Sequence, residues 1–319
     1  MSFQAEIQLL AVLVAAACAL PGVFLVLRRT AMVSDAISHT ILFGIVIGFL
    51  IVRDLESPLL MIGATLTGVL TVWLVELLTR TGRVKEDAAI GLVFPLLFSL
   101  AVILISRFAG NAHLDNDAVL LGEIGFAPFD RLTLLGLDLP RGVWVMGGIL
   151  LVNLLFIVLF YKELKLTTFD PGLAAALGFA PAALHYALMT LVSLTAVGAF
   201  DAVGAILVIA LMIGPPAAAY LLTDRLPTLL ALSVLIGAVS ALAGYWTARV
   251  FDTTISGAMA TMVGISFTLA FLFAPHRGVV AALHQRARQR RNFAQEMLAA
   301  HLPRHEGRAR AAEEDRLAT

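Results

Sequence analysis

Residues 33–52 read VSDAISHTILFGIVIGFLIV, a stretch in which a short polar beginning passes directly into an almost unbroken apolar run. A helix needs roughly 20 apolar residues to cross the hydrocarbon core of a bilayer, and this stretch has that length. Its apolar residues are continuous rather than alternating, which favours a helical span over a strand of a barrel. The stretch therefore predicts a transmembrane helix that carries Asp35 and His39 near its start.

The rest of the chain has the same character. Of its 319 residues 60% are hydrophobic and 14% are charged, and the mean hydropathy is +0.94. A soluble domain of this length cannot hide so much apolar surface, so lipid must solvate much of it. The composition predicts an all-α, polytopic transmembrane helix bundle with nine apolar runs, at about 8–27, 34–52, 58–79, 88–107, 142–161, 184–200, 202–222, 228–249 and 255–275.

The sixth and seventh runs form one stretch that is too long for a single crossing. Within GAFDAVGA, residues Gly198, Asp201 and Gly204 offer a tight reversal or a broken helix. Two full spans or a re-entrant segment both fit, so the bundle has eight or nine spans with broken helices.

The connections between the runs differ in charge. Alternate connections, together with the tail 276–319, hold most of the 22 Lys and Arg residues. Cytoplasmic connections of membrane proteins are enriched in these residues, which predicts an outer N-terminus and a cytoplasmic C-terminus in a cell (inner) membrane. The expected organisation is a transmembrane domain over 1–275, with a cytoplasmic segment at 162–183, and a basic polar tail over 276–319. This tail suits solvent or lipid head groups better than nucleic acid.

The cytoplasmic segment contains FDPGLAAALG, whose residue order predicts a short helix. Asp170 can cap its start, Pro171 sits at the first helical position, and Gly178 ends it. Such an alanine-rich helix between two spans suits docking into a partner's groove. An ordinary interfacial connector is the equally open alternative.

Asp35 and His39 lie four residues apart and so share one face of their helix. Ionisable residues in a span usually face the protein interior or a water-filled path, and one carboxylate with one imidazole suits Mn²⁺, Fe²⁺ or Zn²⁺. Two ligands are too few alone, so another subunit, a further acid or water must complete the shell. The alternative is structural, with Asp35 capping the helix start and His39 bonding a neighbouring carbonyl.

Other acidic residues are weaker candidates for the same path. Asp201 stands in very apolar surroundings, and Glu123 in LLGEIGF could attract cations on the outer side. The chain contains neither a Walker A pattern for ATP nor the HExxH pattern of a metalloprotease. We therefore expect no enzymatic activity and no permanently bound cofactor.

Several long motifs resemble the permease subunits of metal-ion ABC importers, which take up manganese, zinc or iron. They are LRRTAMVSDAISHTILFGIVIGF, GRVKEDAAIGLVFPLLFSLAVILIS with HLDNDAVLLGEI after it, and FDAVGAILVIALMIGPPAAAYLLTDRLPTLL. The resemblance covers residues 8–275 in the right order. It is strongest to the second permease of manganese and iron systems that have two different permeases.

The resemblance implies the partners and the site. It implies a second permease subunit, identical or different, two cytoplasmic ATPase subunits, and an extracytoplasmic protein that delivers the metal. Asp35 and His39 match the family's metal-coordinating pair. The residues expected to couple the permease to the ATPase are Phe169, Asp170, Pro171, Gly172, Leu177 and Gly178.

The function expected is ATP-driven import of a divalent metal ion by alternating access, with the metal as substrate. The alternative is a secondary transporter or channel that works without ATP. A pathway of that kind needs several buried charges, and the spans of this chain hold few. The ligand types do not separate Mn²⁺, Fe²⁺ and Zn²⁺.

Overall fold

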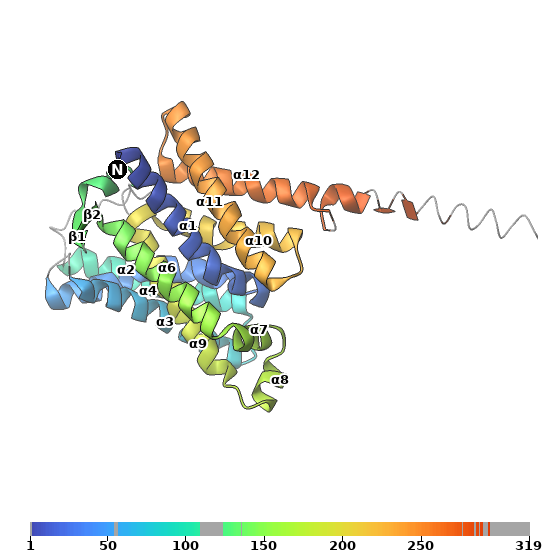
Figure 1. Cartoon of the computed structure of the whole chain (residues 1–319). Coiled ribbons are helices and arrows are strands. Elements are labelled where there is room, and N and C mark those ends of the chain that lie inside the picture. The colour runs from blue at the N-terminus through green and yellow to red at the C-terminus, as the bar shows by residue number, and fades with distance from the viewer. Residues whose placement is uncertain are drawn as a thin grey trace, which may run out of the picture. The chain divides into compact units, whose positions relative to one another are not determined.

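The computed structural model describes residues 2–53, 57–108, 124–134, 136–275, 277–283, 285–286, 288–289 and 293. Almost all of the described chain is helical (Figure 1). The elements are α1 (Phe3–Arg28), α2 (Ala31–Val52), α3 (Pro58–Arg80), α4 (Glu86–Phe108), η1 (Ile124–Phe129), β1 (Arg131–Leu134), β2 (Leu137–Pro140), α6 (Arg141–Leu159), α7 (Tyr161–Phe169), α8 (Pro171–Ala176), α9 (Pro181–Val203), α10 (Ala205–Leu222), α11 (Leu226–Phe251) and α12 (Ile255–Phe273).

Within the described ranges, nine helices are long and apolar enough to cross a membrane. They are α1 to α4, α6 and α9 to α12, and they correspond one for one to the predicted apolar runs. The long stretch at 184–222 divides at Gly204, which has a φ of 79° and lies between α9 and α10. Glycine adopts this backbone conformation without the steric cost that a side chain adds. The predicted break is confirmed, and the helices on either side of it each have the length of a span.

The core is built around α1, and 78% of the residues in the most apolar stretch of this helix are buried. Small side chains over residues 15–19 let α6, α9, α10 and α11 pack closely around this helix. At Gly22 the backbone of α10 comes so near that a Cβ atom would collide with the Met212 carbonyl oxygen. Close backbone approach at small residues is the usual way in which helices associate in lipid.

A second close pair is formed by α2 and α3, which cross at Gly44 and Gly63. A hydrogen bond of 2.8 Å from the Thr71 hydroxyl to that of Thr40 joins the same two helices within the core. This packing fixes the position of α2, the helix that carries Asp35 and His39.

The connection between α4 and α6 contains a feature that sequence reasoning did not anticipate. After η1, β1 and β2 form an antiparallel hairpin in which Arg131 pairs with Pro140 and Leu132 with Leu139. The hairpin is held to the start of α1 by Arg131, whose Nη2 lies 3.2 Å from Oε1 of the buried Glu6. This hydrogen bond is the main reason that the pKa of Arg131 is raised above its usual value.

The hairpin and the segment α7–α8 lie at opposite ends of the helices (Figure 1). The hairpin contacts the beginning of α1 through Glu6, whereas α7 contacts its last residue, Arg28, through Thr167 and Thr168. The chain divides into two compact units, Met1–Thr268 and Leu269–Thr319. In the second unit the Gly278 amide donates to the Ala274 carbonyl at 3.0 Å, and helical residues follow.

Candidate metal site

Asp35 and His39 meet on one face of α2. Nε2 of His39 lies 3.5 Å from Oδ1 of Asp35, and the two side chains are 30% and 41% exposed respectively. The predicted i, i+4 pairing is therefore confirmed as a contact. Both groups keep enough exposure to receive a further ligand.

The hydroxyl groups beside the pair do not contribute to it. Ser34 donates to the Ala31 carbonyl at 2.8 Å and Ser38 donates to the Ser34 carbonyl at 2.9 Å, and both side chains are buried. They occupy the core-facing side of α2, whereas Asp35 and His39 lie on a partly exposed side. The His39 ring packs instead against Phe94 of α4, with the ring centroids 4.9 Å apart.

The interpretation of Asp35 as a helix cap is wrong. The helix begins at Ala31 after Thr30, and its first turn contains no acidic residue. A cap must stand at the boundary to reach the first free amides, and Asp35 is already beyond it. With a rise of about 1.5 Å per residue, His39 lies roughly 12 Å into the helix, which moves the pair toward the middle of the span.

Within the described ranges, no group of three or more His, Cys, Asp or Glu side chains is arranged to hold a metal ion. Asp35 and His39 are thus an incomplete set of ligands in one chain. Their residue types still fit a divalent transition metal, because carboxylate oxygen and imidazole nitrogen are its common ligands.

Asp201 is not brought to this pair. It is exposed and lies in the last turn of α9, two residues before that helix ends. The starts of α2 and α9 lie at the same end of the molecule, since Thr30, Val33 and His185 line one cavity. Asp201 is therefore at the opposite end of α9 from the region of Asp35. Glu123 lies outside the described residues.

The predicted short helix at FDPGLAAALG is confirmed as α8. Oδ1 of Asp170 accepts a hydrogen bond of 2.9 Å from the Leu173 amide, and Pro171 occupies the first helical position. Gly178 has a φ of 86°, and Phe179 donates to the Ala174 carbonyl while Gly178 donates to that of Ala175. This pair of bonds is a Schellman motif, which satisfies carbonyl groups that the helix end leaves free.

The surface of this short helix is unusually apolar for a segment outside the spans. Phe169 at the end of α7, Leu173 within α8 and Leu177 at the C-cap of α8 are 63%, 48% and 61% exposed. Gly172 lies between them, and its added Cβ would meet only Oδ1 of Asp170. Exposed apolar side chains in and beside a capped short helix are suited to insertion into a protein groove.

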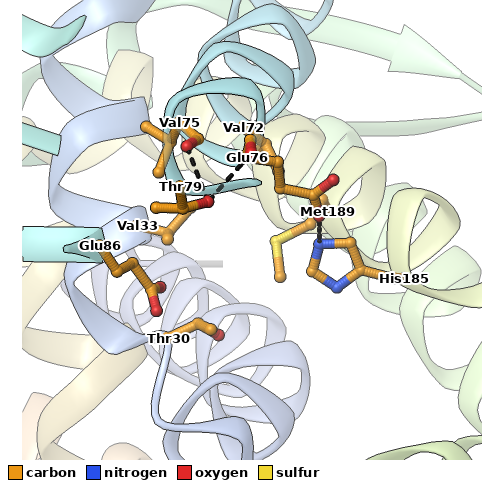
Figure 2. A pocket seen from close by; sticks show the side chains of 9 residues that line it. All are labelled: Thr30, Val33, Val72, Val75, Glu76, Thr79, Glu86, His185 and Met189. Carbon is orange, nitrogen blue, oxygen red and sulfur yellow. Dashed lines mark hydrogen bonds and ion pairs between the residues drawn. The ribbon is translucent and has the colours of Figure 1, made fainter. Parts of the chain in front are cut away.

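A cluster of polar side chains at the end of the helices that α7 contacts was not anticipated from the sequence. Figure 2 shows Glu76 of α3 and His185 of α9 pointing toward each other beside a cavity of about 150 Å³, with Glu86 of α4 on its other side. Nε2 of His185 lies 2.8 Å from Oε1 of Glu76. The only signal in the sequence is that each residue is an ionisable group near the end of an apolar run, which does not reveal that the two meet.

Comparisons with known proteins identify the family to which the chain belongs. Residues 2–275 match the family model described as ABC 3 transport family. The zinc transport system membrane protein TroD of Treponema pallidum is 52% identical over 86% of this chain and 75% of its own length. The manganese transport system membrane protein MntD of Bacillus subtilis is 50% identical over 88% of this chain and 95% of its own.

Solved structures show the same arrangement of helices. PsaBC from Streptococcus pneumoniae, in complex with Fab, aligns with a TM-score of 0.73 and 28% identity over 87% of this chain and 94% of that one. An inward-facing conformation of a putative metal-chelate type ABC transporter aligns with a TM-score of 0.58 at 19% identity, which supports the fold alone. The family match and the identities of 52% and 50% over most of the chain confirm the resemblance seen in its motifs: this chain belongs to the ABC 3 transport family and is a permease of the metal ABC transporter type.

Proposed function

We propose that this chain is the membrane-spanning permease subunit of an ATP-driven importer for a divalent transition-metal ion, Mn²⁺, Fe²⁺ or Zn²⁺. The observation that carries the proposal is the Asp35–His39 contact on a partly exposed side of α2. Relatives named for zinc, manganese and iron transport support the class of substrate. The metal is the cargo, and no resident cofactor is required.

The incomplete ligand set suggests how the pathway is assembled. A carboxylate and an imidazole leave most of a metal's coordination positions open, so further ligands must come from a second permease subunit, identical or different, or from water. An incomplete site also suits transport, because an ion that is held too tightly cannot leave. In this proposal the two permeases face each other across the path, and the ion passes between them by alternating access.

The binding protein and the ATPase are assigned in this proposal to opposite sides of the membrane. On the outer side, near the hairpin and the acidic connection with Glu123, an extracytoplasmic binding protein delivers the metal. On the cytoplasmic side, Phe169, Leu173 and Leu177 insert into an ATPase subunit, which supplies the energy that this chain cannot supply itself. The chain is a multi-pass protein of the cell (inner) membrane, with its N-terminus outside and its C-terminal tail in the cytoplasm.

The test is uptake of radiolabelled Mn²⁺, Fe²⁺ and Zn²⁺ into cells that express the chain with its ATPase and binding-protein partners. We expect Asp35→Ala with His39→Ala to lower uptake at least roughly tenfold, because each lost charged or coordinating contact costs about 1.5–3 kcal/mol. Ser38→Ala is the matched control on the same helix, since its hydroxyl bonds only the helix backbone, and it should transport normally.

Two results would contradict the proposal in different ways. Normal uptake by an assembled Asp35→Ala, His39→Ala variant would remove the pair from the pathway. Uptake that persists without the ATPase subunits would favour a secondary transporter or channel instead. The ion taken up best by the unmodified complex identifies the substrate.

A further inference from the structure

A line of polar contacts begins at the end of α1 and reaches the segment that contains α8. Arg28, the last residue of α1, donates from Nε to the Thr168 hydroxyl and from Nη2 to the Thr167 hydroxyl, both at 3.2 Å. These threonines belong to α7, which leads directly into α8. The third nitrogen of the guanidinium, Nη1, lies 3.3 Å from Nδ1 of His185 on α9.

The contacts continue from His185 to α3. A guanidinium has only donors, so Nδ1 of His185 accepts and its ring proton resides on Nε2. That nitrogen lies 2.8 Å from Oε1 of Glu76, an ion-pair distance at which the two atoms do not have the geometry of a hydrogen bond, while Oε2 of Glu76 accepts a bond of 2.6 Å from the Tyr186 hydroxyl. These polar contacts connect α7, α1, α9 and α3, and we call them the Arg28–His185–Glu76 bridge.

The last step leads from α3 to the helix of the candidate metal site. Glu76 is on the same helix as Thr71, whose hydroxyl donates to that of Thr40 on α2, and as Gly63, which touches Gly44 of α2 backbone to backbone. Backbone packing this close means that a displacement of α3 toward or away from α2 must alter the contacts of α2 as well. An unbroken series of contacts thus runs from α7 to the helix that carries Asp35 and His39.

The Arg28–His185–Glu76 bridge is mostly shielded from water, and this position costs free energy. The side chains of Glu76 and His185 are only 27% and 23% exposed, and removing a carboxylate such as that of Glu76 from water costs free energy that its contacts often do not repay. The cavity of about 150 Å³ lies directly beside the two residues and is also lined by Thr30 and Val33, at the start of α2. Space at this point lets the ends of α2, α3 and α9 shift without first breaking a close-packed core.

We propose that the Arg28–His185–Glu76 bridge transmits movement of the α7–α8 segment to α3 and α2, so that ATP hydrolysis on the partner opens the metal site. Arg28, His185 and Glu76 are positioning residues in this proposal and do not bind the metal. The inference rests on the proposed function, since it requires an ATPase at α8 and a metal at Asp35 and His39. It adds the residues by which the two are connected.

The experiment uses the whole complex, with both permeases, the ATPase subunits and the binding protein, in proteoliposomes. ATP hydrolysis and uptake of a radiolabelled metal are measured together, with Mn²⁺, Fe²⁺ or Zn²⁺ chosen as the ion that the unmodified complex transports. We expect His185→Leu and Glu76→Ala to reduce the metal taken up per ATP hydrolysed roughly tenfold, because each loses a charge-assisted contact. Hydrolysis itself should continue, because the ATPase site is on another chain.

Three further variants make the result specific. His185→Gln keeps one N–H donor for Glu76 and one acceptor for Arg28, so it should restore most of the coupling. Thr167→Val with Thr168→Val removes only two hydroxyls at nearly constant volume, and should lower the ratio even if the larger changes impair assembly. Arg80→Gln is the control, because Arg80 meets Glu76 only within α3, at 3.3 Å, and is 71% exposed.

The outcomes separate the two proposals. An unchanged ratio of metal to ATP in assembled His185→Leu or in the double threonine variant would overturn the bridge. An equal loss in Arg80→Gln would also overturn it, by showing that any change near Glu76 has the same effect. Failure of the unmodified complex to couple uptake to ATP would instead refute the proposed function.

Discussion

At the scale of single residues, the positions without side chains decide how closely the helices approach. Gly22 in α1 faces the Met212 carbonyl of α10, and a Cβ atom there would overlap the oxygen. Gly147 in α6 is the contrasting case, because an added Cβ would meet nothing within 4 Å. The two glycines are indistinguishable in an apolar sequence, and only the packing separates them.

Gly22→Ala should therefore destabilise the protein. We expect a loss of about 1–3 kcal/mol, typical of an overpacked core, because the backbone of α10 must move to admit the methyl group. The measurement is thermal unfolding of the purified protein in detergent, followed by circular dichroism.

Gly147→Ala serves as the control for this substitution. Alanine is the better helix former by up to about 1 kcal/mol, so this variant should unfold at the same temperature or higher. Equal stability of the Gly22→Ala protein and the unmodified protein would show that α1 and α10 are not in close contact.

The candidate metal pair also belongs to this scale. The spacing of Asp35 and His39 predicted that they share a helix face, and the 3.5 Å contact confirms it. The spacing did not decide between a metal ligand and a cap for Asp35. That choice depends on where α2 begins, and the start at Ala31 excludes the cap.

At the scale of elements, α8 was predicted from local chemistry because its boundaries are local. The Asp170 cap, Pro171 and the positive φ of Gly178 act within one short stretch of chain. The exposure of Phe169, Leu173 and Leu177 depends on the surrounding helices and could not be derived in this way.

Leu177→Glu should weaken binding of the ATPase subunit. Placing a charge on the exposed apolar row removes a buried contact and adds a desolvation cost, so we expect at least a roughly tenfold loss of affinity. Co-purification of the ATPase with the tagged permease measures it.

Leu151→Glu is not a fair comparison, because a charge inside a span disrupts insertion. Leu151→Ala provides a better control together with Leu177→Ala, since Leu151 is 66% exposed on the apolar helix α6. We expect Leu177→Ala to reduce ATPase recovery and Leu151→Ala to leave it unchanged. The docking role of α8 would be refuted by full recovery with Leu177→Glu.

At the scale of the whole molecule, different elements contact the two ends of α1. The hairpin is attached to the beginning of α1 by the Arg131–Glu6 ion pair, and α7 is attached to its last residue by the Arg28 contacts. The charge bias of the loops predicts that the first of these ends is outside the cell and the second is in the cytoplasm.

Cysteine labelling can test this orientation, because the native Cys18 is buried and should not react. A membrane-impermeant maleimide applied to intact cells should label Phe126→Cys, at the hairpin end, where the native side chain is 62% exposed. Ala175→Cys, on exposed α8, should react only after the membrane is permeabilised. The reverse pattern would invert the predicted topology.

The sequence alone determined the approximate extent of the apolar runs, an interruption within residues 198–204, the caps of α8 and the helix face that Asp35 shares with His39. These features depend on hydropathy, helical periodicity and backbone chemistry, all of which act over a few neighbouring residues. The tertiary structure decided the rest: the separation of Asp201 from Asp35 and His39, the hairpin attached to α1, and the meeting of Arg28, Glu76 and His185. Each of these joins residues from different parts of the chain, and only the packing of whole helices brings such residues together.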